Sequence, residues 1–168
     1  PRLATPPASI FASPPAATIH STENMNTTAS SAAIVGKEHW TRKGDVKLFL
    51  WEKKAADGKG DKGTVLFVHG SSMASQPTFD LQVPGRADSS VMDWFAQRGF
   101  NTWCVDMEGY GRSDKSRDLY FDIANGADDL AAASDYIMKA TGAKKFMVYG
   151  ISSGALRAAM FAERHPER

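Results

Sequence analysis

The chain has 168 residues, 42% of them hydrophobic and 23% charged, which gives room for one domain of ordinary size and excludes a wholly disordered, collagen-like or coiled-coil protein. Its 20 basic and 19 acidic residues give a formal net charge of +1, so the basic surface of a nucleic-acid-binding protein is not expected. No run of about 18 apolar residues is present, so no membrane span is predicted.

The N-terminal segment, residues 1–36, differs in composition from the rest of the chain. It consists largely of Pro, Ala, Ser and Thr, and Arg2 and Glu23 are its only charged residues. Such a composition predicts a disordered extension, because it offers too little apolar surface to bury. The expected organisation is therefore an extension over residues 1–36 and a folded region over residues 37–168.

The cysteine content bears on the cellular compartment. The single cysteine, Cys104, cannot form an internal disulfide and favours a reducing compartment. A cytoplasmic location is the expectation, with a targeting remnant as the alternative interpretation of the N-terminal extension.

From residue 37 onward, apolar and periodic runs predict the elements of the fold. Residues 38–42 and 46–53 flank a Lys43-Gly44-Asp45 turn and are typical of a β-hairpin. An apolar strand follows over residues 64–68, and then a helix over 90–98 with Ser90 as its N-cap. The alternation of strand and helix continues over 100–105, 122–140, 145–149 and 153–164.

Continuous apolar strands that alternate with helices indicate a parallel sheet buried on both faces, so the predicted fold class is α/β. Catalytic residues of such sheets gather just beyond the carboxyl ends of the strands. The informative residues are therefore those that follow Val68, Val105 and Tyr149.

A Gly-x-Ser-x-Gly motif, Gly150 to Gly154, lies between the last predicted strand and the last helix. Small residues around the serine allow neighbouring backbones to approach closely, and the tight turn holds the serine exposed at the top of the sheet. Ser152 is therefore the candidate nucleophile. The alternative is an ordinary turn of small residues.

The loop after the first parallel strand reads His69-Gly70-Ser71-Ser72. An oxyanion hole needs two N–H donors, one from the residue after the nucleophile, here Ser153, and one from this earlier loop. Ser71, or alternatively Ser72, is the candidate for the second donor. His69 is expected to shape the loop and not to transfer protons.

The segment after the middle parallel strand, Asp106 to Ser113, contains a Gly-x-Gly but no third glycine, and a long loop precedes the next helix, so a dinucleotide site is not predicted. The four histidines are widely separated and give no metal-ligand spacing. Neither a cofactor nor a metal is expected. The histidines are His20, His39, His69 and His165.

Taken together, VLFVHG, DMEGYGRSDK and VYGISSG resemble, in order and separation, the N-terminal half of an α/β-hydrolase of the hydrolase-1 type. The resemblance covers residues 37–168 and implies a mostly parallel sheet with flanking helices, truncated after the helix that follows the nucleophile elbow. It implies that Ser152 is the nucleophile, that Ser153 and Ser71 or Ser72 supply oxyanion N–H groups, and that Asp106 supports loop geometry. A serine at this position departs from the dehalogenase and epoxide-hydrolase branches, which have aspartate there.

In this fold an acidic residue and then a histidine follow the serine along the chain. His165 lies about 20 Å from Ser152 along the same predicted helix, too far to act as its base. The expectation is therefore a fragment, inactive alone, of a serine hydrolase that attacks a small-molecule ester, thioester or amide. The alternatives are an acyltransferase of the same fold and a non-catalytic ligand-binding or truncated protein; the oligomeric state is left open.

Overall fold

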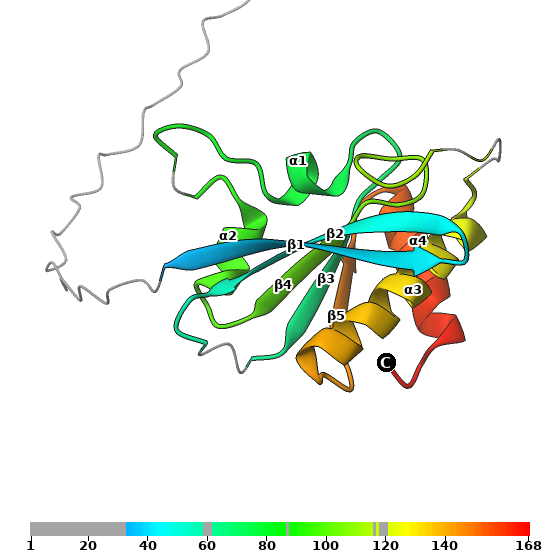
Figure 1. Ribbon diagram of the computed structural model, residues 1–168. Coiled ribbons are helices and arrows are strands. Elements are labelled where there is room, and N and C mark those ends of the chain that lie inside the picture. The colour runs from blue at the N-terminus through cyan, green and yellow to red at the C-terminus, as the bar shows by residue number, and fades with distance from the viewer. Residues whose placement is uncertain (1–32, 59–61, 87, 116, 118–120) are drawn as a thin grey trace, which may run out of the picture. The chain divides into compact units, whose positions relative to one another are not determined.

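The computed structural model describes residues 33–58, 62–86, 88–115, 117 and 121–168. Within these residues a five-stranded sheet has the strand order β1-β2-β4-β3-β5 (Figure 1). The strands are β1 Ile34–Lys43, β2 Val46–Ala55, β3 Thr64–Val68, β4 Asn101–Val105 and β5 Met147–Gly150. The helices are α1 Ser75–Phe79, α2 Val91–Ala96, α3 Ile123–Thr141 and α4 Ser153–Arg164. Most of the extension predicted over residues 1–36 lies outside the described residues.

The sheet combines an antiparallel hairpin with a parallel part. β1 is antiparallel to β2, and β2 is antiparallel to β4. β3 lies between β4 and β5 and is parallel to both, which confirms the predicted α/β class. Because β4, β3 and β5 run in the same direction, the segments that follow them meet at the carboxyl ends of these strands, at the top of Figure 1.

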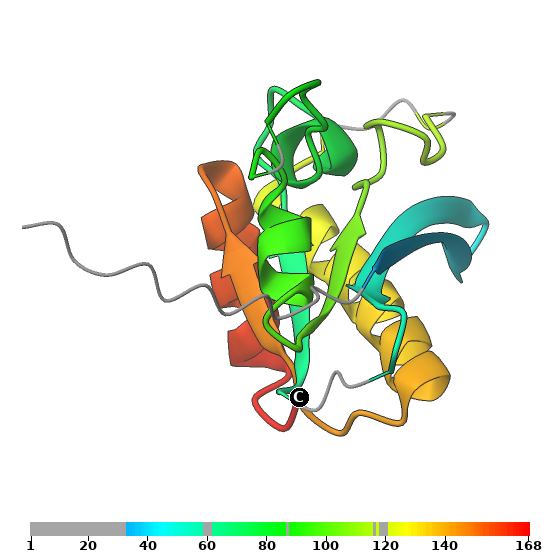
Figure 2. The same cartoon turned by 90° about the vertical axis from the view of Figure 1, so that its left-hand side faces the viewer.

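Helices cover both faces of the sheet. Leu66 and Val68 of β3 belong to the core that includes residues of α3 and α4, whereas Val65 and Phe67 pack with residues of α1 and α2. This alternation follows from the two-residue period of a strand. Figures 1 and 2 show α2 on one side of the sheet and α3 and α4 on the other. Each large apolar side chain buried in this way contributes roughly 1.5–3 kcal/mol.

The helix boundaries agree with their capping residues. The side chain of Asp122 accepts a hydrogen bond from the N–H of Asn125 at the start of α3, and Gly142 ends that helix in the left-handed conformation, with φ 74°. At 19 residues α3 is the longest helix, yet no helix among the described residues is long and apolar enough to cross a membrane. The short helix α1, which contains Pro77, was not predicted.

Candidate active site

The turn between β5 and α4 holds Ser152 in an unusual backbone conformation. Ser152 has φ 53° and ψ −132°, and it is the only non-glycine residue with positive φ among the described residues. It follows β5 after a single intervening residue, and α4 begins at Ser153. A backbone outlier of this kind costs of order 1–3 kcal/mol and persists only where the surrounding structure imposes it.

The two glycines of the motif account for the tightness of this turn. A Cβ atom at Gly150 would lie 2.4 Å from the carbonyl oxygen of Gly154, and one at Gly154 would lie 2.3 Å from the carbonyl oxygen of Val68. No side chain fits at either position, because real Cβ atoms essentially never come within 3.0 Å of another heavy atom in this way. The backbone of α4 is therefore pressed against the end of β3, and the exposed side chain of Ser152 lies beside Gly70.

The loop after β3 meets the first residue of α4 through a pair of hydroxyl groups. The Oγ atoms of Ser71 and Ser153 are 2.6 Å apart and share a hydrogen bond. Within the described part of the chain, the backbone N–H groups of Ser71, Ser72 and Ser153 donate to no acceptor. The structure thus brings the three candidate oxyanion donors to the same end of α4, where the helix macrodipole also favours negative charge.

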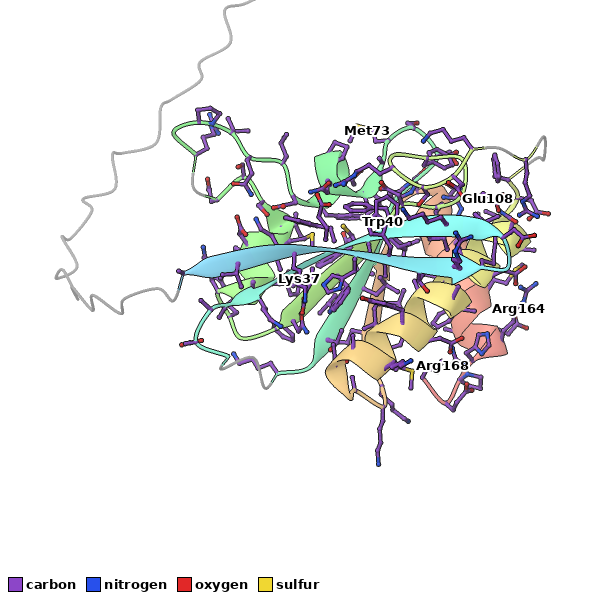
Figure 3. All side chains as sticks on the ribbon, viewed as in Figure 1. Lys37, Trp40, Met73, Glu108, Arg164 and Arg168 are labelled. Carbon is purple, nitrogen blue, oxygen red and sulfur yellow. The ribbon has the colours of Figure 1, made fainter. Side chains whose placement is uncertain are left out.

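An open pocket of about 250 Å³ borders Ser152. Its lining residues come from the loop after β3, from α1 and from the turn before α4: Gly70, Ser71, Ser72, Met73, Thr78, Ile151 and Ser152. Met73, labelled in Figure 3 at the upper edge of the molecule, is half exposed. A larger cavity of about 410 Å³, which includes Lys37, borders none of the candidate site residues.

His69 is fully buried, and both of its ring nitrogens form hydrogen bonds with backbone groups. Its Nε2 accepts a hydrogen bond from the N–H of Met107, at 3.1 Å, so the proton is on Nδ1, which donates to the carbonyl oxygen of Gly70 at 2.6 Å. Burial lowers the pKa of His69 and the charge of Arg157 lowers it further, against the hydrogen bond to Gly70 and the charge of Asp106. In this arrangement His69 is neutral and fastens the loop after β3 to the segment after β4.

Asp106 makes a second connection between the same two segments. One carboxylate oxygen accepts hydrogen bonds from the backbone N–H and the hydroxyl of Ser75, at 2.8 and 2.6 Å, and the other accepts from the N–H of Arg112, at 2.8 Å. Its carbonyl oxygen accepts from the hydroxyl of Ser113 at 2.6 Å. Asp106 is only 2% exposed and lies so close to Gly111 that a Cβ atom there would be 2.0 Å from its carboxylate.

None of the acids and histidines that the structure describes forms a hydrogen bond with Ser152. His39 is buried and bonded to Glu52 and Tyr136, and His165 lies at the C-terminal end of α4, beside Glu167. His20 falls outside the described residues. In the same part of the chain, no three His, Cys, Asp or Glu side chains are grouped so that they could hold a metal ion.

One residue of the site was missed from the sequence. Arg157 is 2% exposed, and its guanidinium lies against the carbonyl oxygen of His69 and the hydroxyl of Ser71. The buried residues of α4 are Gly154, Arg157 and Phe161, which are spaced by three and four residues. That helical spacing is the sequence signal that places Arg157 on the inner face of α4.

Comparison with solved structures shows the same fold in several enzymes. The chain is similar to a CIB-like hydrolase from Thermoplasma acidophilum, with 20% identity and TM-score 0.59, and to the esterase Pf2001 from Pyrococcus furiosus, with 21% and 0.61. It is also similar to the epoxide hydrolase VrEH1 from Vigna radiata, with 19% and 0.59. The matches cover 80%, 80% and 79% of this chain, which spans 59%, 48% and 35% of the three structures respectively.

Comparison with curated protein sequences found no match. A family profile described as alpha/beta hydrolase fold matches residues 63–168, which include β3, β4, β5, all four helices and the turn that carries Ser152. The chain therefore belongs to the alpha/beta hydrolase fold family.

Proposed function

We propose that this chain carries the nucleophile and the oxyanion-binding groups of a serine hydrolase. The observation that carries the proposal is the backbone of Ser152, which is held at positive φ between two glycines at whose positions no side chain fits. Strain of this kind concentrates at functional sites, where it presents a reactive group. The open pocket that borders Ser152 gives a small substrate access to the hydroxyl.

In the proposed reaction, the hydroxyl of Ser152 gives its proton to a base as its oxygen attacks the carbonyl carbon of an ester, thioester or amide. The carbonyl oxygen becomes negatively charged, and the free N–H groups of Ser153 and of Ser71 or Ser72 donate to it. The tetrahedral intermediate then expels the alcohol, thiol or amine, which takes up the proton from the protonated base, and an acyl-enzyme remains on Ser152. Water hydrolyses this acyl-enzyme to the free acid and restores the serine hydroxyl.

The proposal requires a base for Ser152, since a serine hydroxyl is a weak nucleophile without one. None of the described acids or histidines is bonded to Ser152, and the chain spans about a third to three fifths of the length of the structures it matches. We therefore propose that the acid and the histidine of the triad lie in the same protein but outside this chain. The 168-residue chain alone is then expected to be inactive.

The proposal is tested by labelling the full-length protein with a fluorophosphonate, which reacts with activated serines, and locating the adduct by peptide mass spectrometry. An adduct on Ser152 that is lost in Ser152→Ala and kept in Ser89→Ala, a serine remote from the site in the loop before α2, is the expected result. A folded full-length protein that reacts at no serine, or whose labelling survives Ser152→Ala, would overturn it, and the former result would favour a ligand-binding role.

A further inference from the structure

Arg157 carries a buried positive charge for which the described residues provide no carboxylate. Its side chain is 2% exposed, and it forms no ion pair with any acid that the structure describes. Its Nη1 donates to the carbonyl oxygen of His69 at 3.2 Å, and its Nε has no hydrogen-bond partner. Because burying an unpaired charge is strongly unfavourable, packing alone does not account for an arginine here.

The surroundings of Arg157 hold its guanidinium in one place. The aliphatic part of the side chain passes over Gly126 of α3, where a Cβ atom would lie 2.5 Å from Cδ of Arg157. The guanidinium carbon lies 5.8 Å from the centre of the Tyr110 ring. Side chains on a helix point towards its N-terminus, so Arg157 reaches back one turn to the level of Ser153. The cation is thus fixed directly behind the loop that carries Ser71.

The hydroxyl pair of Ser71 and Ser153 connects this charge to the candidate site. Nη2 of Arg157 lies 3.5 Å from Oγ of Ser71, and because arginine is only a donor, Ser71 accepts. The two hydroxyl groups have two protons, and only one of them lies between the oxygens, which are 2.6 Å apart. The other proton remains free to be donated outward, from a hydroxyl polarised by the cation.

We propose that Arg157, Ser71 and Ser153 form a donor relay that presents a polarised side-chain hydroxyl, beside the backbone N–H groups, to the oxyanion formed at Ser152. Arg157 is a positioning residue in this relay, since it acts through Ser71. The inference rests on the proposed function of Ser152. The relay favours substrates whose carbonyl oxygen gains a full negative charge in the transition state, because only such a transition state is stabilised by the charge of Arg157.

The test measures kcat and KM of the full-length protein with a neutral p-nitrophenyl ester, for Arg157→Met, Ser153→Ala and the double variant. Arg164→Met is the matched control, because Arg164, labelled in Figure 3, lies at the surface on the same helix and, among the residues that the structure describes, forms an ion pair only with exposed Asp128. Each single variant is expected to lower kcat roughly 10-fold to 100-fold with little change in KM, since loss of one oxyanion donor is worth about 100-fold or more at the strongest sites. The double variant should lose less than about twofold more than the worse single variant.

Thermal unfolding separates this role from a structural one. Arg157→Met is expected to leave the melting temperature unchanged or to raise it while kcat falls, because it removes an unpaired buried charge. If Arg157→Met folds poorly, the same cycle with Ser71→Ala and Ser153→Ala, which removes each hydroxyl of the pair, decides the question. Single effects that multiply in the double variant, or an Arg157→Met enzyme as active as Arg164→Met, would overturn the relay. A Ser152→Ala variant with full turnover would instead refute the proposed function, and the relay with it.

Discussion

Replacing Ser152 by glycine and by alanine separates the strain of the turn from the chemistry of the hydroxyl. Both variants lack the hydroxyl, but alanine keeps a Cβ atom at φ 53°, whereas glycine adopts positive φ freely. The strain is of order 1–3 kcal/mol, and the greater freedom of glycine in the unfolded chain takes back about 0.5–1 kcal/mol. Ser152→Gly should therefore be more stable than Ser152→Ala by about 1 kcal/mol, within a range of about 0–2.5 kcal/mol.

Urea unfolding of the full-length protein, followed by circular dichroism, measures this difference. Ala155→Gly is the matched control, because Ala155 lies in the first turn of α4 at an exposed, ordinary helical position. There the same loss of a Cβ atom should lower stability by about 0.5–1 kcal/mol. The strain at Ser152 would be refuted if Ser152→Gly were less stable than Ser152→Ala. The refuting difference is as large as the loss of stability that Ala155→Gly causes in the unsubstituted protein.

Three further predictions concern packing, pH and the sheet edge. Gly154→Ala should lower the urea midpoint by the equivalent of about 1–3 kcal/mol or more and abolish fluorophosphonate labelling, because its Cβ would lie 2.3 Å from a carbonyl oxygen of β3; unchanged stability would contradict the close approach. The hydrogen bond from Arg117, together with Lys43, lowers the pKa of Glu108 to about 2. The stability that this carboxylate contributes is therefore present above pH 4.5 and is lost as the pH falls towards 2, so the urea midpoint should depend less on pH in Glu108→Gln across this range. An equal pH dependence in the variant would count against the ion pair. The 168-residue chain alone should aggregate through β5, where Met147 and Tyr149 are 47% and 52% exposed, and Met147→Lys should reduce light scattering; a monodisperse unsubstituted chain would be the contrary result.

Much of the fold followed from local signals in the sequence. The helix predicted over residues 153–164 has those bounds in α4, and the one predicted over 122–140 matches α3 to within a residue, because Asp122 caps its start and Gly142 stops it. β1 begins at Ile34, before its predicted start at residue 38, because pairing with β2 extends to Ala55. That extension depends on a partner strand, which a local pattern does not reveal.

The candidate site was predictable where it depends on motif spacing and not where it depends on tertiary contacts. Gly150 and Gly154 alone predict a tight turn around Ser152, and the structure places both where a side chain would collide with neighbouring backbone atoms. The position of Arg157 behind Ser71 depends on how α4 packs against α3 and the end of β3. The short helix α1 was missed because it contains only five residues and a proline, too few for a periodic pattern to emerge.

The hydrogen bonds of His69 and Asp106 fix the backbone at the carboxyl ends of β3 and β4 but do not reach the exposed side chains around the pocket. The backbone beneath the pocket is tied by hydrogen bonds to buried side chains, whereas Met73 projects from the rim, half exposed. Changes at the rim can therefore alter the shape offered to a ligand without loosening the frame that holds the serine. Under the proposed function, substitutions at this rim are expected to change substrate preference while the backbone that holds Ser152 keeps its position.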